Sequence, residues 1–196
     1  MVDTPELFGG ELRILAAVDF ADDKIVRWVD YWDSSAFDSD LYAQFRTPAD
    51  SFPTDLKDGA VPPRAAPDLV ETATQLHSAF ASADTSAAGS LLHTDVVLED
   101  MALRAQVVGR IEAVTYLGRV LDRVPYGASS ALRHVVGGSG GGGFEWTAGS
   151  GAGRLPGITA LERDGDGLVT RLTSVYDSRQ LEPQLRTALL AAIFAT

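Results

Sequence analysis

The sequence lacks cysteine altogether, has only three histidines and contains no long apolar run. Without cysteine there can be no disulfide, no thiolate nucleophile and no zinc–thiolate site. His77, His93 and His134 show no paired spacing, so we expect no metal site and no cofactor. The longest apolar stretch, near the C-terminus, is too short and too interrupted to cross a bilayer, so no membrane association is expected.

Cationic residues are also scarce: 16 Lys and Arg stand against 27 Asp and Glu, which gives a net charge of −11. Nucleic acids and anionic membranes are themselves polyanionic, so this balance argues against binding either through charge. The N-terminal residues show no basic region followed by an apolar stretch, and thus no visible signal peptide. We therefore expect a soluble, cytoplasmic protein that binds no nucleic acid.

The sequence contains an internal repeat. Residues 14–34 (ILAAVDFADDKIVRWVDYWDS) align without a gap with residues 158–178 (ITALERDGDGLVTRLTSVYDS), at an offset of 144 positions. Arg27/Arg171 and Asp33/Asp177 are among the identical pairs. Both copies have the pattern of a strand, a tight acidic turn and a second strand. The offset is about the length of one small domain, which predicts a partial repeat followed by a complete one.

The boundaries follow from composition. Five prolines fall between positions 48 and 67, without an apolar period, so the polar stretch 38–67 is expected to hold no helix or strand. The predicted organisation is a partial repeat at residues 1–45, a proline-rich linker at 46–67 and a complete domain at 68–196.

Helices come first and strands last in that complete domain. Apolar residues at three- and four-residue spacing predict long helices over 68–83 and 109–124, with shorter ones over 84–92 and 183–194. Strands are predicted at 96–99, 107–108, 131–136 and 144–148, and as a pair within 155–176. This order indicates an α+β fold, in which helices close a curved antiparallel sheet into a cone with an apolar interior. An extra N-terminal β-hairpin would precede it.

Residues 68–180 resemble the NTF2-like superfamily, in particular its SnoaL-like, polyketide-cyclase-like branch. The similarity is carried in order by FASAD, HTDVVLEDMA, GRIEAVTYLGRVLD and GITALERDGDGLVTRLTSVYD. The resemblance implies a cone that holds one or two carboxylates, whose pKa is set by desolvation and by their neighbours. It also implies that two cones can meet through the outer faces of their sheets, and we therefore expect a homodimer.

Asp100 is the candidate catalytic residue. Within LEDMA it matches the place where ketosteroid isomerases carry their general base, at the end of a strand. A base there would move a proton between carbons or remove one beside a carbonyl. The competing interpretation is a turn aspartate that accepts a backbone N–H. The oxyanion-hole positions of that family match Leu76 and Thr159, which cannot replace a tyrosine and a protonated aspartate, so steroid isomerisation of that type is not expected.

Asp30 is the possible second acid. KIVRWVDYWD resembles the strand on which limonene-type epoxide hydrolases place an aspartate in the cone, and Ser174 stands at the equivalent place in the complete copy. Strand alternation puts Trp28 and Trp32 on the same face as Asp30, and Ile25, Val29 and Tyr31 on the other. Asp30 could act only if the hairpin pairs with another cone; otherwise it is a solvated strand residue.

The pocket residues suggested by strand alternation and by the resemblance are Leu76, His77, Phe80, Tyr116, Trp146, Thr159, Leu161, Leu172, Ser174 and Tyr176.

The expected function is acid/base chemistry (cyclisation, isomerisation or epoxide opening) on an apolar small molecule such as a polyketide or terpenoid. The alternative is a non-catalytic ligand-binding or dimerisation module of the same fold, which the missing second acid favours. For the N-terminal hairpin we expect packing against a sheet, because an isolated two-stranded hairpin is barely stable in water.

Overall fold

The computed structural model describes residues 2–3, 12–45, 47, 51, 65–149 and 154–193. Nine strands and five α-helices lie in these ranges. The strands are β1 (Val2–Asp3), β2 (Leu12–Ala21), β3 (Lys24–Trp32), β4 (Leu92–Asp100), β5 (Ala105–Val108), β6 (Ser130–Gly138), β7 (Gly141–Ala148), β8 (Leu155–Arg163) and β9 (Val169–Tyr176). The helices are α2 (Ser39–Phe45), α3 (Pro67–Ala81), α4 (Thr85–Ser90), α5 (Arg110–Val120) and α6 (Pro183–Ile193).

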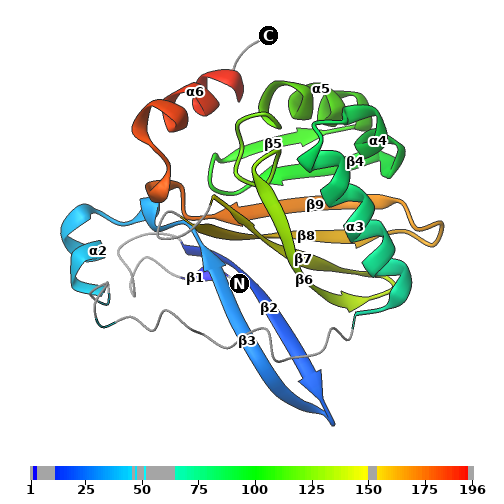
Figure 1. The fold of residues 1–196 in the computed structure, drawn as a ribbon, viewed down its shortest axis with the longest axis horizontal. Coiled ribbons are helices and arrows are strands. Elements are labelled where there is room, and N and C mark those ends of the chain that lie inside the picture. The colour runs from blue at the N-terminus through cyan, green and yellow to red at the C-terminus, as the bar shows by residue number, and fades with distance from the viewer. Residues whose placement is uncertain are drawn as a thin grey trace.

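The complete domain is a curved six-stranded sheet in the order β5-β4-β9-β8-β7-β6, with helices over one face (Figure 1). This confirms the α+β cone preceded by an extra hairpin. The cone's interior is the main hydrophobic core, to which α3 contributes Leu69, Ala73, Leu76 and Phe80 at helical spacing. Pro67 occupies the first turn of α3, where its missing N–H would have no partner in any case.

One strand pairing differs from the expected antiparallel sheet. β4 runs parallel to β9, pairing Leu98 with Leu172 and Asp100 with Ser174, whereas the other described pairings in this sheet are antiparallel. A parallel pair needs a long connection, and the chain between β4 and β9 is long enough, since it includes α5 and four strands. The consequence for the site is that Asp100 lies beside Ser174 on neighbouring strands.

Two helix predictions were also inaccurate. The stretch 38–67 was expected to hold no element, but α2 forms within it over Ser39–Phe45. Prolines begin only at position 48, so the segment before them is free to form a helix. The helix predicted over 109–124 ends at Val120, and turns occupy positions 121–129. Apolar spacing continues past the helix end because Leu121 and Val124 in these turns are also buried in the core.

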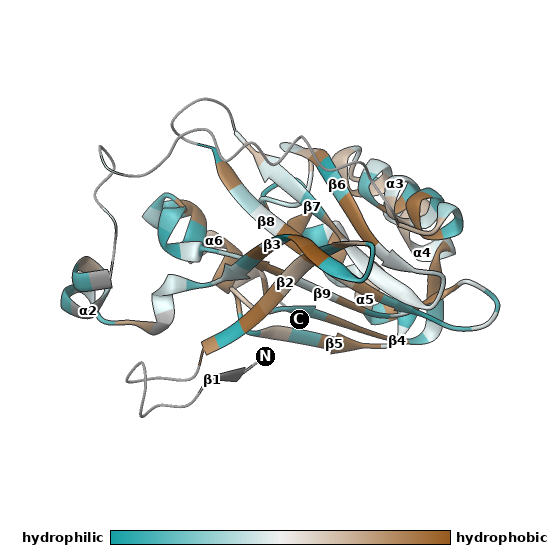
Figure 2. Ribbon diagram, turned by 90° about the horizontal axis from the view of Figure 1, so that it is seen from below, coloured by the Kyte–Doolittle hydropathy of each residue, from teal (hydrophilic) through white to brown (hydrophobic). Residues whose placement is uncertain are grey.

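The hairpin formed by β2 and β3 lies across the outer face of the sheet, opposite the helices (Figure 2). Leu15, Ala17, Val29 and Tyr31 face the sheet and form a second apolar cluster with residues that include Ile158 and Val175. The expectation that the hairpin packs against a sheet is therefore confirmed, and the sheet is that of its own chain.

The faces of the hairpin depart from simple alternation near its turn. Register shifts between Asp19 and Phe20, which leaves Val26 without a partner on β2. Beyond this bulge Ile25 is 50% exposed rather than packed with Val29 and Tyr31, and Trp28 on the opposite face is also 50% exposed. The turn end of the hairpin projects beyond the sheet, so the sheet does not cover Ile25, and Trp28 lies on the face turned away from the sheet (Figure 1).

A candidate acid–base site inside the cone

Asp100 ends β4 with its side chain in the cone and no surface exposed to solvent. Its Oδ1 accepts a hydrogen bond from the backbone N–H of Leu103 at 2.9 Å, as a turn aspartate does. Its Oδ2 lies 3.4 Å from the hydroxyl of Tyr176, a long hydrogen bond. Among the described residues, no arginine or lysine forms an ion pair with it.

Burial raises the pKa of Asp100 to about 7, although hydrogen bonds from Leu103, Tyr126, Ala102 and Tyr176 act in the opposite direction. Removing the carboxylate from water without a cation nearby disfavours its charged form. A carboxyl that titrates near neutral pH can both accept and return a proton there, which is the property that a general base requires.

Three tyrosines surround this carboxyl. Tyr116 comes from α5, Tyr126 from the turns that follow that helix, and Tyr176 from the end of β9. Burial and the neighbouring Asp100 raise the pKa of Tyr116 and Tyr176, so their hydroxyls remain protonated donors at neutral pH. The hydroxyl oxygens of Tyr116 and Tyr126 are buried and reach no partner of normal hydrogen-bond geometry among the described residues. Unsatisfied buried hydroxyls are uncommon and call for an explanation.

A second polar chain crosses the floor of the cone. The indole Nε1 of Trp146 donates to Oγ1 of Thr159 at 3.1 Å, and this oxygen lies 2.9 Å from Oγ of Ser174. Trp146 packs flat on Gly157, where an added Cβ would come within 2.3 Å of the indole ring, so glycine is required there. Its ring also contacts Tyr126 and Tyr176, each at a centroid distance of 6.0 Å.

Most of the predicted pocket residues therefore meet in one place. Leu76, Phe80, Leu161 and Leu172 are buried in the core around the polar groups. His77 is buried but lies on another side of the cone, where its Nε2 is 3.1 Å from Oγ of Ser130. Burial lowers the pKa of His77, so it is a neutral packing residue at physiological pH.

Asp30 does not face this interior. It lies on the exposed face of the hairpin, where its Oδ1 accepts a hydrogen bond from Trp28 Nε1 at 2.6 Å. β3 corresponds to β9 of the complete repeat, and Asp30 lies on the face that in β9 points into the cone. The hairpin packs on the sheet through its opposite face, so the face that carries Asp30 points to solvent. In this structure the hairpin thus supplies no second acid to the cone that holds Asp100.

Tyr126 was not identified from the sequence. It follows Pro125 in a stretch of turns, where neither helical nor strand periodicity indicates which way a side chain points. The only sequence signal was its place next to proline, just after the long helix.

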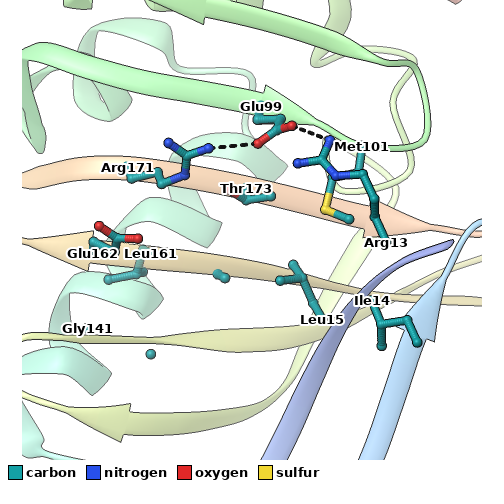
Figure 3. A pocket seen from close by; sticks show the side chains of 12 residues that line it. Arg13, Ile14, Leu15, Glu99, Met101, Gly141, Leu161, Glu162, Arg171 and Thr173 are labelled. Atoms are coloured by element: carbon teal, nitrogen blue, oxygen red, sulfur yellow. Dashed lines mark hydrogen bonds and ion pairs between the residues drawn. The ribbon is translucent and has the colours of Figure 1, made fainter. Parts of the chain in front are cut away.

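A pocket with a volume of about 430 Å³ lies on the other side of the sheet, between the hairpin and the outer face (Figure 3). There the guanidinium groups of Arg13 and Arg171 both reach the carboxylate of Glu99, at 2.5 and 2.9 Å. Burial alone would raise the pKa of Glu99, but these two ion pairs lower it below its ordinary value. A carboxylate held ionised by two cations is a poor base, so Glu99 differs from Asp100 in the property that a general base requires.

No protein-family model and no curated protein sequence matches the chain. Solved structures do match its fold. An uncharacterised protein with a cystatin-like fold from Silicibacter pomeroyi is 20% identical, with a TM-score of 0.50 over 62% of this chain and 82% of its own. A steroid delta-isomerase from Pseudomonas aeruginosa is 19% identical, with a TM-score of 0.50 over 67% of this chain and 93% of its own. A de novo designed protein with a curved β-sheet reaches 0.51 at 11% identity, over 63% and 95%.

The fold is the NTF2-like cone. At these identities the likeness concerns the fold alone, and the fold hosts unrelated activities. Among the described residues, no helix is long and apolar enough to cross a membrane, and no cluster of His, Cys, Asp or Glu could hold a metal ion. Any assignment of chemistry must therefore come from Asp100 and its surroundings.

Proposed function

We propose that the protein catalyses proton transfer at carbon on a small apolar carbonyl compound, with Asp100 as the base. The observation that carries this proposal is a fully buried carboxyl with a pKa near 7, set among tyrosine hydroxyls of which two make no hydrogen bond of normal geometry to a described residue. A carboxyl buried for stability alone would instead be expected to have its neighbouring hydroxyls satisfied.

In the proposed step, the carboxylate of Asp100 removes a proton from the carbon beside the carbonyl, and the C–H electron pair moves to form an enolate. A tyrosine hydroxyl donates a hydrogen bond to the enolate oxygen, where negative charge develops. The protonated Asp100 then returns the proton to the same carbon or to a conjugated one. Tyr116 and Tyr126 suit the donor role because their buried hydroxyls lie near Asp100 and make no hydrogen bond of normal geometry to a described residue.

The substrate class is a compact apolar ketone, of the kind found among polyketide and terpenoid intermediates. The walls of the site are aromatic and aliphatic, and Asp100 has no exposed surface, so a ligand must displace side chains to reach it. Cyclisation of a SnoaL-like type would use the same first step, the formation of an enolate. Epoxide opening has less support, because that chemistry needs a second acid and Asp30 lies on the exposed face of the hairpin.

The test is hydrogen exchange at the α-carbon of cyclohexanone in D₂O, followed by NMR. We expect the wild-type protein to accelerate exchange, with a rate that rises through about pH 7 as Asp100 loses its proton. Asp100→Asn should abolish the acceleration while the protein remains folded, and Asp30→Asn should leave it unchanged. If the wild-type protein exchanges no faster than Asp100→Asn at any pH, catalysis by Asp100 is refuted.

A non-catalytic module is the second candidate, and one observation favours it. Trp146, Tyr126, Tyr176, Phe80 and Phe144 are among the largest fully buried side chains, and they fill the cone. The homodimer expected from the sequence remains a prediction. The outer face that would join two cones carries the hairpin here, so a dimer would need another surface, and sedimentation velocity of the full chain tests for one.

A further inference from the structure

The ends of the two repeated hairpins contact each other reciprocally. Oδ1 of Asp33 accepts hydrogen bonds from the backbone N–H and the hydroxyl of Ser178, both at 2.9 Å. Oδ1 of Asp177 accepts from the backbone N–H and the hydroxyl of Ser34, at 3.2 and 2.7 Å. In the aligned sequences Asp33 matches Asp177 and Ser34 matches Ser178. The aspartate of each repeat therefore accepts hydrogen bonds from the serine of the other repeat.

The strands that lead to these contacts have the same register. In β2 and β3, six pairs run from Ile14↔Trp32 to Asp19↔Arg27 before a bulge. In β8 and β9, six pairs run from Gly157↔Tyr176 to Glu162↔Arg171 before a bulge at the same step. The second strands correspond at an offset of 144, but the first strands correspond at 143, because the turn of the N-terminal hairpin is one residue shorter. The ungapped alignment of the sequences was therefore wrong by one position on the first strand.

Equivalent residues also meet in the apolar interface. Tyr31 and Val175 correspond at an offset of 144, Leu15 and Ile158 correspond at 143, and all four lie in the cluster between hairpin and sheet. In an isologous interface both partners use the same surface, so each contact occurs twice with the roles of the two partners exchanged. Such an interface forms around a two-fold axis. Such interfaces ordinarily join two copies of one chain.

We propose that the outer face of the sheet is a two-fold self-association surface whose partner half is supplied by residues 12–37 of the same chain. The hairpin stands where the last two strands of a second cone would stand, so this face is closed to a second copy. The matched registers support the interpretation of residues 1–45 as a partial repeat. This inference is independent of the proposed chemistry at Asp100.

Polar contacts explain why the hairpin, rather than a second cone, fills this face. Glu145 on β7 has no exposed surface, and it accepts hydrogen bonds from Arg27 at 2.7 Å and from the hydroxyl of Tyr31. The strand of a second cone equivalent to β3 is β9, which carries valine, Val175, in place of Tyr31. A second cone would bring the equivalent arginine, Arg171, to Glu145 but not the hydroxyl that Tyr31 donates.

The absence of native cysteine allows a direct test with Ser34→Cys/Ser178→Cys, which keeps both aspartates and introduces the only thiols. After treatment with a short bis-maleimide, we expect an intrachain bridge: denatured protein of monomer mass that carries one doubly attached linker, independent of protein concentration. The control Trp28→Cys/Ser178→Cys, with one thiol on the exposed face of the hairpin, should carry only singly attached linkers.

Bridging between two chains in the first variant would show that the hairpin is exchanged between copies, and would overturn the proposal. Ser34 and Ser178 are both buried, so the contrary result is specific: two singly attached linkers in the first variant would show that both thiols are reached but the two ends do not meet, with the same consequence. A second measurement guards against local disturbance by the thiols: Asp33→Ala and Asp177→Ala should each lower the melting temperature, by similar amounts. A clear loss for only one of them would contradict the reciprocal interface.

Discussion

The hairpins β2–β3 and β8–β9 share a register and a bulge, yet their corresponding faces lie in opposite surroundings. Leu172, Ser174 and Tyr176 of β9 are buried inside the cone. Their counterparts on β3 are Trp28, Asp30 and Trp32, and Trp28 is half exposed. The local sequence of each hairpin thus determines its strand register and bulge. The burial of its side chains depends instead on which other elements pack against each face. Helices cover this face of β9, whereas on β3 only Trp32, at one end, packs against a described ring, that of Phe37 (Figures 1 and 2).

The equivalent arginines offer the strongest way to test this comparison. Arg27 is buried between Asp19 and Glu145, whereas the side chain of Arg171 is 38% exposed and shares Glu99 with Arg13. Arg27→Ala leaves Glu145 buried without a cation, and we expect a loss of about 3–5 kcal/mol in the free energy of unfolding. Arg171→Ala should cost less than about 1 kcal/mol, because solvent screens the pair and Arg13 remains.

Urea unfolding of the two variants measures this difference. Equal losses would mean that the hairpin does not bury its ion pair against the sheet, and would contradict the docking that separates the two hairpins. Arg27→Lys serves as a matched control, since it keeps the charge but has a single point of contact; its loss should lie between those of the two alanine variants.

The buried and exposed acids should differ in how stability depends on pH. The folded-state pKa of Asp100 is about 7, above its ordinary value of 3.8, so the folded protein binds more protons than the unfolded chain between these values. Stability from this group is therefore greatest in acid and falls as the pH rises toward 7, at up to about 1.4 kcal/mol per pH unit. Asp100→Asn removes this dependence, and its melting temperature should equal or exceed that of the wild type at pH 8.

Differential scanning calorimetry between pH 5 and pH 8 measures the gap between the two proteins, which should widen with pH. The lowered pKa of His77 acts in the opposite direction, but it is common to both proteins and cancels in the difference. Asp30→Asn, which removes one carboxylate from an exposed position, is the matched control. Parallel curves for Asp100→Asn would show that its carboxyl is not desolvated in the folded state.

How far the sequence reaches can be judged from particular residues. Asp100 could be placed in the cone through the resemblance of LEDMA to the strand end where ketosteroid isomerases carry their base, and the cone itself followed from the order of helices and strands. Tyr126 could not be placed, because turns have no period that fixes the direction of a side chain. The exposure of Ile25 was missed because a β-bulge shifts the following side chains to the other face of the strand. The sequence alone does not show where such a bulge falls.

The turns of the two hairpins give the smallest expected effect. The N-terminal hairpin turns through Asp22 and Asp23, whose φ angles of 49° and 60° lie in the left-handed region, whereas the longer turn before β9 places Gly167 at 84°. Type I′ turns of two residues favour glycine at the second position, because a side chain there is strained. Asp23→Gly should therefore stabilise the protein by several tenths of a kcal/mol, up to about 1 kcal/mol. Gly167→Ala should destabilise it by about 1 kcal/mol, since the same strain is then introduced. Chemical denaturation of both variants resolves the two signs. A loss of stability in Asp23→Gly would mean that the aspartate side chain holds the turn by contacts that outweigh its backbone strain.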